Sequence, residues 1–221
     1  MKKNNKKTEI RTKTQDRLRL IIKKFESVEE WKNARIGKIT GTRLKDIVVL
    51  RGTEEKKGFY QLIAERLATP RPEGEDKMER GHELEVEAIE LCEKEIGKKF
   101  NKDLVLWMRG DDNSIAISPD GFTEDLKEAA EVKCLSSADH IEAVLKNQYP
   151  DEYKFQVLQY FIVNEELKVL HFIMYDPSLS VHQYIRFEIK REDIKDEIEK
   201  YKEYERQKLE LVKKAVIQLS F

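Results

Sequence analysis

The chain has 221 residues and a formal net charge of −1 at pH 7, with 38% charged and 39% hydrophobic residues. This length suits a single domain covering 1–221, and the near-zero balance excludes a global field that would indicate nucleic acid as a partner. Because the apolar residues cluster with clear periodicity, the composition favours a globular protein with a highly charged surface over a disordered chain.

The first part of the chain is predicted to be mainly helical. Residues 1–24 form a basic segment, which could contact phosphates or be a solvated tail. Within it, residues 14–24 have the pattern of a short amphipathic helix. Ser27 followed by Glu30 is a capping-box pattern that is typical of a helix start. Further helices are predicted at 42–50 with Thr42 as its cap, at 58–68, and at 79–97, where a glycine ends the helix.

The pattern changes to strands after residue 100. Strands are predicted at 104–107, 114–117, 122, 129–135, 169–175 and 183–189. Helices are predicted at 138–146 and 150–164, and a charged helix at 192–218 closes the chain. This order predicts an α/β or α+β fold with a central mixed β-sheet flanked by helices.

The cysteine and histidine content excludes several classes of site. Cys92 and Cys134 are the two cysteines and have no paired spacing. That excludes a disulfide framework, a cysteine zinc site and a four-cysteine iron–sulfur cluster within one chain. The four histidines show no HExxH or similar grouping. Since the chain has no apolar run of about 18 residues and no apolar signal core at its N-terminus, we expect a cytoplasmic protein with no membrane contact.

Two carboxylates and a lysine lie in one otherwise apolar stretch of the sequence. Asp120 belongs to a Pro-Asp-Gly turn, and Glu131 and Lys133 share one face of the following strand because side chains alternate. Asp120 could meet Glu131 across the hairpin, where a divalent cation would relieve their repulsion. Oxygen ligands favour Mg²⁺, which would support phosphodiester hydrolysis. The alternative is a salt-bridged hairpin without catalytic chemistry.

A further glutamate lies where structural needs do not explain it. At 100° per residue, Glu85 falls within about 60° of an apolar stripe that includes Ile89 and Cys92. It is either one half of a buried ion pair or a further metal ligand, direct or through water. Gln156, in an almost wholly apolar helix, is a weaker candidate of the same kind, because a core amide with hydrogen-bond partners explains it equally well.

The motifs, taken in their order along the chain, resemble those of the PD-(D/E)xK nuclease superfamily, which has a restriction-endonuclease-like core. An Asp-x₁₀-Glu-x-Lys pattern after Ser-Pro follows a helical glutamate and precedes Tyr-x-x-Gln-Val. Within that superfamily, the chain is similar to the phage-type recombination exonucleases related to lambda exonuclease, the YqaJ-like group. WKNARIGKITGT at 31–42 and RGHELEVEA at 80–88 resemble two further segments of this group.

The resemblance implies a role for each matching residue. The metal ligands would be Asp120, Glu131, the Val132 carbonyl and Glu85. Lys133 would be the catalytic lysine, and Gln156 would complete the site. Arg35 would bind the 5′ phosphate of a DNA end, with Thr42 and Ser118 as lesser candidates. Leu158 replaces a second glutamine that the family often has, and Gln159 follows one position later, so the resemblance does not assign that amide.

The resemblance also implies an activity and partners. Such proteins use Mg²⁺, with Mn²⁺ as a substitute, to digest linear double-stranded DNA from its 5′ ends and leave 3′ single strands. A ring-shaped homotrimer, a single-strand annealing recombinase as partner, and a bacterial or phage-infected cell are implied in the same way. The alternatives are a related endonuclease, a RecB-like or Cas4-like nuclease without an iron–sulfur cluster, and a non-catalytic DNA-binding module.

Overall fold

The computed structural model of the chain describes residues 9–11, 20–50, 55–67 and 78–220. The helices are α1 (Val28–Arg35), α2 (Leu44–Ile47), α3 (Lys57–Leu67), α4 (Met78–Ile96), α5 (Ser137–Lys146), α6 (Lys154–Val163) and α7 (Lys195–Leu219). Short 3-10 turns, η1 (Asp151–Tyr153) and η2 (Arg191–Ile194), precede α6 and α7. The strands are β1 (Glu9–Arg11), β2 (Leu20–Lys24), β3 (Val105–Arg109), β4 (Ala116–Ile117), β5 (Gly121–Phe122), β6 (Glu128–Lys133), β7 (Val169–Tyr175) and β8 (Tyr184–Lys190).

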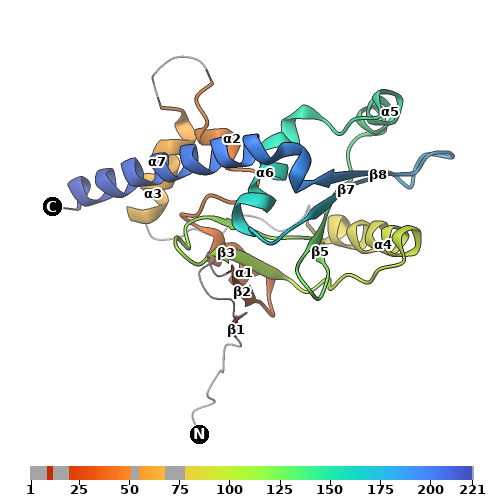
Figure 1. The fold of residues 1–221 in the computed structure, drawn as a ribbon, viewed down its shortest axis with the longest axis horizontal. Helices are drawn as coiled ribbons and strands as arrows, with labels where there is room; N and C mark the ends of the chain where they lie inside the picture. The colour runs from red at the N-terminus through yellow and green to blue at the C-terminus, as the bar shows by residue number, and fades with distance from the viewer. Residues whose placement is uncertain (1–8, 12–19, 51–54, 68–77, 221) are drawn as a thin grey trace, which may run out of the picture.

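The strands form two sheets of four (Figure 1). Strands β1 to β4 pair in chain order and are all antiparallel. Strands β5 to β8 also pair in chain order, but β6 and β7 run parallel, with α5 and α6 in the connection between them. The prediction of a mixed sheet flanked by helices is therefore confirmed, and an antiparallel sheet accompanies it.

Helices cover both faces of the mixed sheet. On one face α4 packs against β6, β7 and β8, and its Ile89 and Cys92 join Val132 in a buried apolar cluster. On the other face α6 lies between β7 and the strands β3 and β4, and α7 packs across α6 and α3 (Figure 1). Every residue of α6 from Gln156 to Val163 is buried. No helix in the described part of the chain is both long and apolar enough to span a bilayer.

Strand β6 directs its side chains alternately to these two layers. Ala130 and Val132 belong to the cluster beneath α4, whereas Ala129 belongs to the main core that includes α6. Because side chains alternate along a strand, Glu131 and Lys133 lie on the α6 side. The pleat thus turns one carboxylate and one ammonium toward the buried helix.

The predicted helix at 14–24 is wrong where the structure describes it. Residues 20–24 form β2, which pairs with β3 in antiparallel register, while 12–19 lie outside the described residues. Ile22 belongs to the main core, and Ile21 packs on a separate cluster around Phe25 and Leu106. Apolar side chains that leave a segment on opposite faces are typical of a buried strand and not of an amphipathic helix.

The predicted cap at Thr42 is also wrong. Helix α2 begins only after Arg43 and has no side-chain cap, and Thr42 is exposed. The chain before it makes a turn in which Arg43 N–H donates to the Thr40 carbonyl at 2.8 Å. By contrast, Ser27 caps α1 as predicted, because its hydroxyl accepts a hydrogen bond from Glu30 N–H.

Candidate active site

Glu131 is the centre of a buried hydrogen-bond network. Its Oε1 accepts from Lys133 Nζ and from Gln156 Nε2, both at 2.5 Å. Its Oε2 accepts from the Tyr160 hydroxyl at 2.5 Å. With only 3% of the residue exposed, the carboxylate is held in one orientation by three donors. This satisfies the requirement that a buried charge be paired and hydrogen-bonded.

Asp120 is fixed beside Glu131 by the hairpin of β5 and β6. Its Oδ2 accepts from Val132 N–H at 2.7 Å, and its own N–H donates to the Ala130 carbonyl at 3.2 Å. Burial and then the charges of Glu131 and Glu85 raise the pKa of Asp120 well above its ordinary value. The structure therefore brings together the two carboxylates expected to meet across the hairpin, and Glu85 is close enough to act on one of them.

Glu85 is half-buried on α4, and not fully buried as its position in the apolar stripe predicted. Its charge raises the pKa of Asp120 and also that of the Cys134 thiol, after the larger effect of burial. Glu85 therefore faces the end of β6 from the α4 side of the sheet. It adds a third negative charge to a region of restricted solvation, which is the electrostatic setting that a divalent cation would neutralise.

Lys133 supplies the positive charge of the site. Burial lowers the pKa of its ammonium, but Glu131 and Asp120 outweigh that effect, so the pKa is raised overall. Lys133 is therefore charged at neutral pH. Its Nζ also lies 5.2 Å from the ring centroid of Tyr153, which confines the side chain further.

Arg35 approaches the carboxylates from α1. Its guanidinium carbon stacks 4.1 Å from the Trp31 ring centroid, and Trp31 Nε1 donates to Ser118 Oγ at 2.8 Å. Burial lowers the pKa of Arg35, while Glu131 and Asp120 act in the opposite direction. The predicted residue Ser118 therefore holds the indole on which Arg35 rests, whereas the exposed Thr42 is not part of this network.

Asp120 and Glu131 are the carboxylates of the site that could hold a metal. In the described part of the chain, no three His, Cys, Asp or Glu side chains form a group that could hold an ion, so side chains of these types would supply no more than two direct ligands. Gln156 Oε1 is buried without a hydrogen-bond partner, as expected of an acceptor that binds a water of a hydrated cation. Because a divalent cation can keep several waters and need few protein ligands, the residues fit a hydrated divalent cation.

Tyr160 was missed by the sequence prediction, although a signal was present. It follows Gln156 by four residues and so lies on the same face of α6. Gln159 lies on another face, where its Nε2 donates to the Ile39 carbonyl at 3.2 Å and to Glu205 Oε1 at 3.0 Å. The second amide is therefore outside the site.

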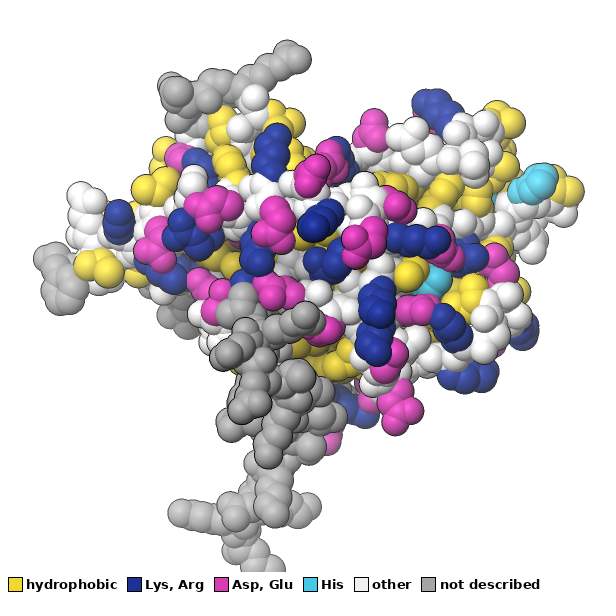
Figure 2. Space-filling view, in the orientation of Figure 1, with side chains coloured by type: hydrophobic (Ala, Val, Ile, Leu, Met, Phe, Trp, Pro, Cys, Tyr) yellow, Lys and Arg dark blue, Asp and Glu magenta, His cyan; other side chains and the backbone are white. Residues whose placement is uncertain are grey.

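The charged side chains on the visible face of the protein are not sorted by sign. In Figure 2, Lys and Arg side chains are intermingled with Asp and Glu over the visible face, without a patch of one sign. This agrees with the net charge of −1. On this face, charges of both signs therefore offset one another and give no general field of one sign.

The mixed sheet, with Asp120 directly before β5 and with Glu131 and Lys133 on β6, has the architecture of the restriction-endonuclease-like class of nuclease folds. Residues 30–166 match the YqaJ-like viral recombinase domain, and because this is more than half of the chain, the protein belongs to that family. No curated protein matches the sequence.

Solved structures agree with this assignment. The alkaline exonuclease LHK-Exo from Laribacter hongkongensis is 27% identical, with a TM-score of 0.72, and the match covers 87% of this chain and 96% of that one. LHK-Exo in complex with dAMP is 26% identical at the same coverage, with a TM-score of 0.73. A phage-related exonuclease from Haemophilus somnus 129PT, 14% identical over 82% of this chain and 94% of its own, shows the shared fold with a TM-score of 0.56. The family and the two LHK-Exo structures indicate a DNA exonuclease.

Proposed function

We propose that the chain is a single-domain, Mg²⁺-dependent exonuclease that digests linear duplex DNA from 5′ to 3′ and leaves 3′ single strands. The observation that carries this proposal is the meeting of Asp120 and Glu131 across one hairpin, with Lys133 hydrogen-bonded to Glu131. The dAMP bound by the similar LHK-Exo protein is a deoxynucleoside monophosphate, the class of product that such digestion releases.

Each residue of the site has a proposed task. Asp120, Glu131 and the Val132 carbonyl would hold the metal, and Glu85 would contact it through water. When bound, Mg²⁺ supplies a Lewis acid for a phosphoryl oxygen and lowers the pKa of a water; Mn²⁺ is the expected substitute.

Lys133 keeps its positive charge beside Glu131, where it can orient the attacking water and stabilise negative charge that develops on the phosphate. Gln156 and Tyr160 hold Glu131 in place. Arg35 would bind the 5′ phosphate, for which a guanidinium fork is suited.

A time course on end-labelled linear duplex tests activity and polarity together. We expect 5′-end degradation that requires Mg²⁺ and stops with EDTA, while a closed circular duplex stays intact. Degradation from the 3′ end would contradict the polarity, and activity in EDTA would contradict the metal.

A matched pair of variants tests the site itself. Glu131→Ala should abolish hydrolysis and retain DNA binding. Glu128→Ala changes a glutamate of the same strand that binds Lys98 and His171 instead, and it should keep activity. Equal losses in both variants would show that the effect comes from the strand and not from the site.

Cleavage of the circular duplex would favour the related endonuclease or a RecB-like nuclease over an exonuclease. A non-catalytic DNA-binding module would bind DNA without any effect of Mg²⁺. The ring-shaped trimer, the annealing recombinase and a place in the cytoplasm of a bacterial or phage-infected cell stay predictions.

A further inference from the structure

The loop from Arg35 to Arg43 is held at Gly37 by two neighbouring residues of α3. Gly37 N–H donates to Glu65 Oε2 at 2.8 Å, and the Gly37 carbonyl accepts from Arg66 Nε and Nη2, both at 3.1 Å. Gly37 has φ +69°, a conformation that favours glycine. Both backbone polar groups of this turn are thus bound by side chains of one helix.

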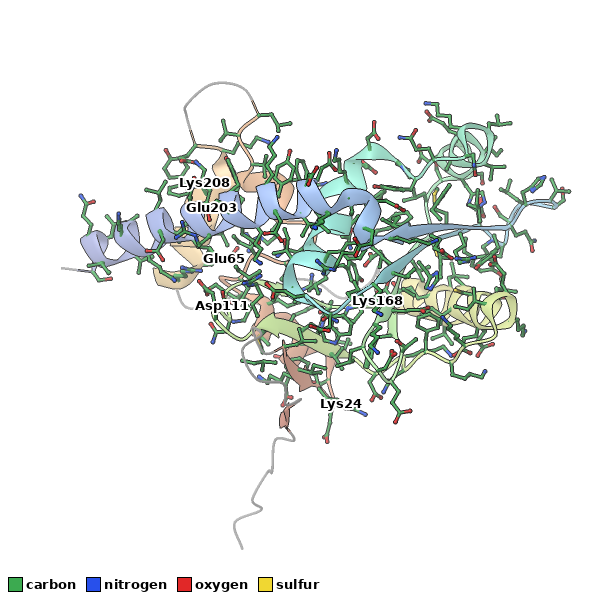
Figure 3. All side chains as sticks on the ribbon, in the orientation of Figure 1. Lys24, Glu65, Asp111, Lys168, Glu203 and Lys208 are labelled. Carbon is green, nitrogen blue, oxygen red and sulfur yellow. The ribbon has the colours of Figure 1, made fainter. Side chains whose placement is uncertain are left out.

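Glu65 also fixes the far end of the same loop. Its two oxygens accept from Arg43 Nη1 at 2.6 Å and Nη2 at 2.7 Å. The bidentate geometry restricts both partners more than a single contact would. Figure 3 labels Glu65 among the side chains below α7. We call Glu65 and Arg66 the loop clamp.

The clamped loop connects the two parts of the candidate site. At its start, Arg35 stacks on Trp31. Near its end, Gly41 is so close to α6 that an added Cβ would lie 3.0 Å from Gln156 Cγ. Any shift of the loop would therefore move Arg35 relative to the residues that hold Glu131.

We propose that Glu65 and Arg66 are positioning residues that set the orientation of Arg35 and thereby the preference for 5′-phosphorylated ends. This inference rests on the proposed function, in which Arg35 binds that phosphate. Arg43 is assigned a structural part, because its guanidinium fork is occupied by Glu65.

The charge of Glu65 makes the inference sharply testable. Removing its carboxylate makes the loop more positive by one charge, so electrostatics alone would strengthen binding of a phosphorylated end. Loss of positioning predicts the opposite, a weaker preference for the phosphate. The two effects differ in sign, so the direction in which the preference changes distinguishes them.

The experiment compares initial rates on duplexes with 5′-phosphate and 5′-hydroxyl ends. For Glu65→Ala we expect the preference for phosphate to fall by at least about tenfold through KM, since misplacement of a positioning group can cost up to about 100-fold in rate. Glu65→Gln keeps the shape of the side chain and one acceptor, so the preference for phosphate should fall less in this variant. It also provides the measurement if the alanine variant does not fold.

The matched control is Glu95→Ala. Glu95 also binds an arginine through both carboxylate oxygens: Arg186 Nη2 and Nε donate to it at 2.9 and 3.1 Å, between α4 and β8. This variant should retain the wild-type preference. An unchanged or increased preference in both Glu65 variants would overturn the inference.

Arg35→Ala separates this inference from the proposed function. If Arg35→Ala removes the preference and the Glu65 variants keep it, only the loop clamp is refuted. If Arg35→Ala keeps the preference, the phosphate assignment fails, and the loop clamp, which acts through Arg35, fails with it. If Arg35→Ala and the Glu65 variants all lower the preference while Glu95→Ala does not, the inference is supported.

Discussion

Replacing Tyr160 by Phe would test how much the site depends on the orientation of Glu131. The change removes one hydroxyl and keeps the aromatic ring. Tyr160 is fully buried, and its hydroxyl donates to Glu131 Oε2 at 2.5 Å. Lys133 and Gln156 both bind the other oxygen, so Oε2 loses the one side-chain donor that it has among the described residues.

The magnitude follows from the burial of both groups. A hydrogen bond to a charged acceptor contributes about 1.5–3 kcal/mol, and water cannot readily replace it at a buried site. For a protein of this length, about 1 kcal/mol corresponds to about 2–4 °C in Tm. We therefore expect Tyr160→Phe to lower Tm by roughly 3–12 °C in the presence of EDTA.

The control is Tyr184→Phe. The Tyr184 hydroxyl also donates to a glutamate, Glu95 Oε2 at 2.8 Å, but the side chain of Glu95 is 45% exposed. Water can take the place of this hydroxyl, so the expected change in Tm is small. The two variants differ in the burial of the acceptor and share the same chemical change.

Thermal unfolding and Mg²⁺ titration calorimetry together provide the assay. Tyr160→Phe should lower Tm and also weaken Mg²⁺ binding, because Glu131 is less well oriented, while Tyr184→Phe changes neither. Equal effects of the two variants, or an unchanged Tyr160→Phe protein, would refute the argument that the buried hydroxyl positions Glu131.

Three further outcomes are expected. Lys133→Ala should lower hydrolysis by about 10²–10⁴-fold and retain duplex binding, and a loss of binding in a gel-shift assay would contradict the role given to Lys133. Gly41→Ala would place a Cβ 2.3 Å from Ile117 Cδ1 and 3.0 Å from Gln156 Cγ, so chemical denaturation should show a loss of about 1–3 kcal/mol together with reduced activity. Burial raises the pKa of Glu205 to about 8, so the folded state keeps a proton that the unfolded carboxyl loses near pH 4.3. Its contribution to stability is therefore complete below about pH 4 and falls as the pH rises to about 8. Glu205→Gln should remove this fall in stability. The prediction would be contradicted if the difference in urea midpoint between the variant and wild type were the same at pH 5 and at pH 9.

The central carboxylates were predictable because their placement depends on local geometry. A Pro-Asp-Gly turn and the two-residue period of a strand are enough to put Asp120 near Glu131, with Lys133 on the same face. The structure confirms this proximity, and the mixed sheet was likewise predicted from the order of strands and helices. What these residues do there stays a proposal.

Features that depend on distant partners were not predictable in the same way. Strand β2 was predicted as a helix, although it pairs with β1 and also with β3, which is about 85 residues away in the sequence. Local periodicity contains no information about such a partner, and two adjacent isoleucines suit either element. The approach of Arg35 to Glu131 likewise depends on how α1 packs against the sheet.

Helix α6 shows why one helix can be apolar almost throughout and still determine the chemistry of the site. One face presents Gln156 and Tyr160 to Glu131, while Gln159 binds the Ile39 carbonyl of the clamped loop and Glu205 of α7. A buried amide or hydroxyl is costly unless it finds a partner, and all three side chains have one: Gln156 and Tyr160 share Glu131, while Gln159 binds the loop and α7. The polar side chains of α6 therefore link strand β6, the clamped loop and the terminal helix to one another. The charged groups of the candidate site are thereby held in a defined arrangement within a chain whose formal net charge is only −1.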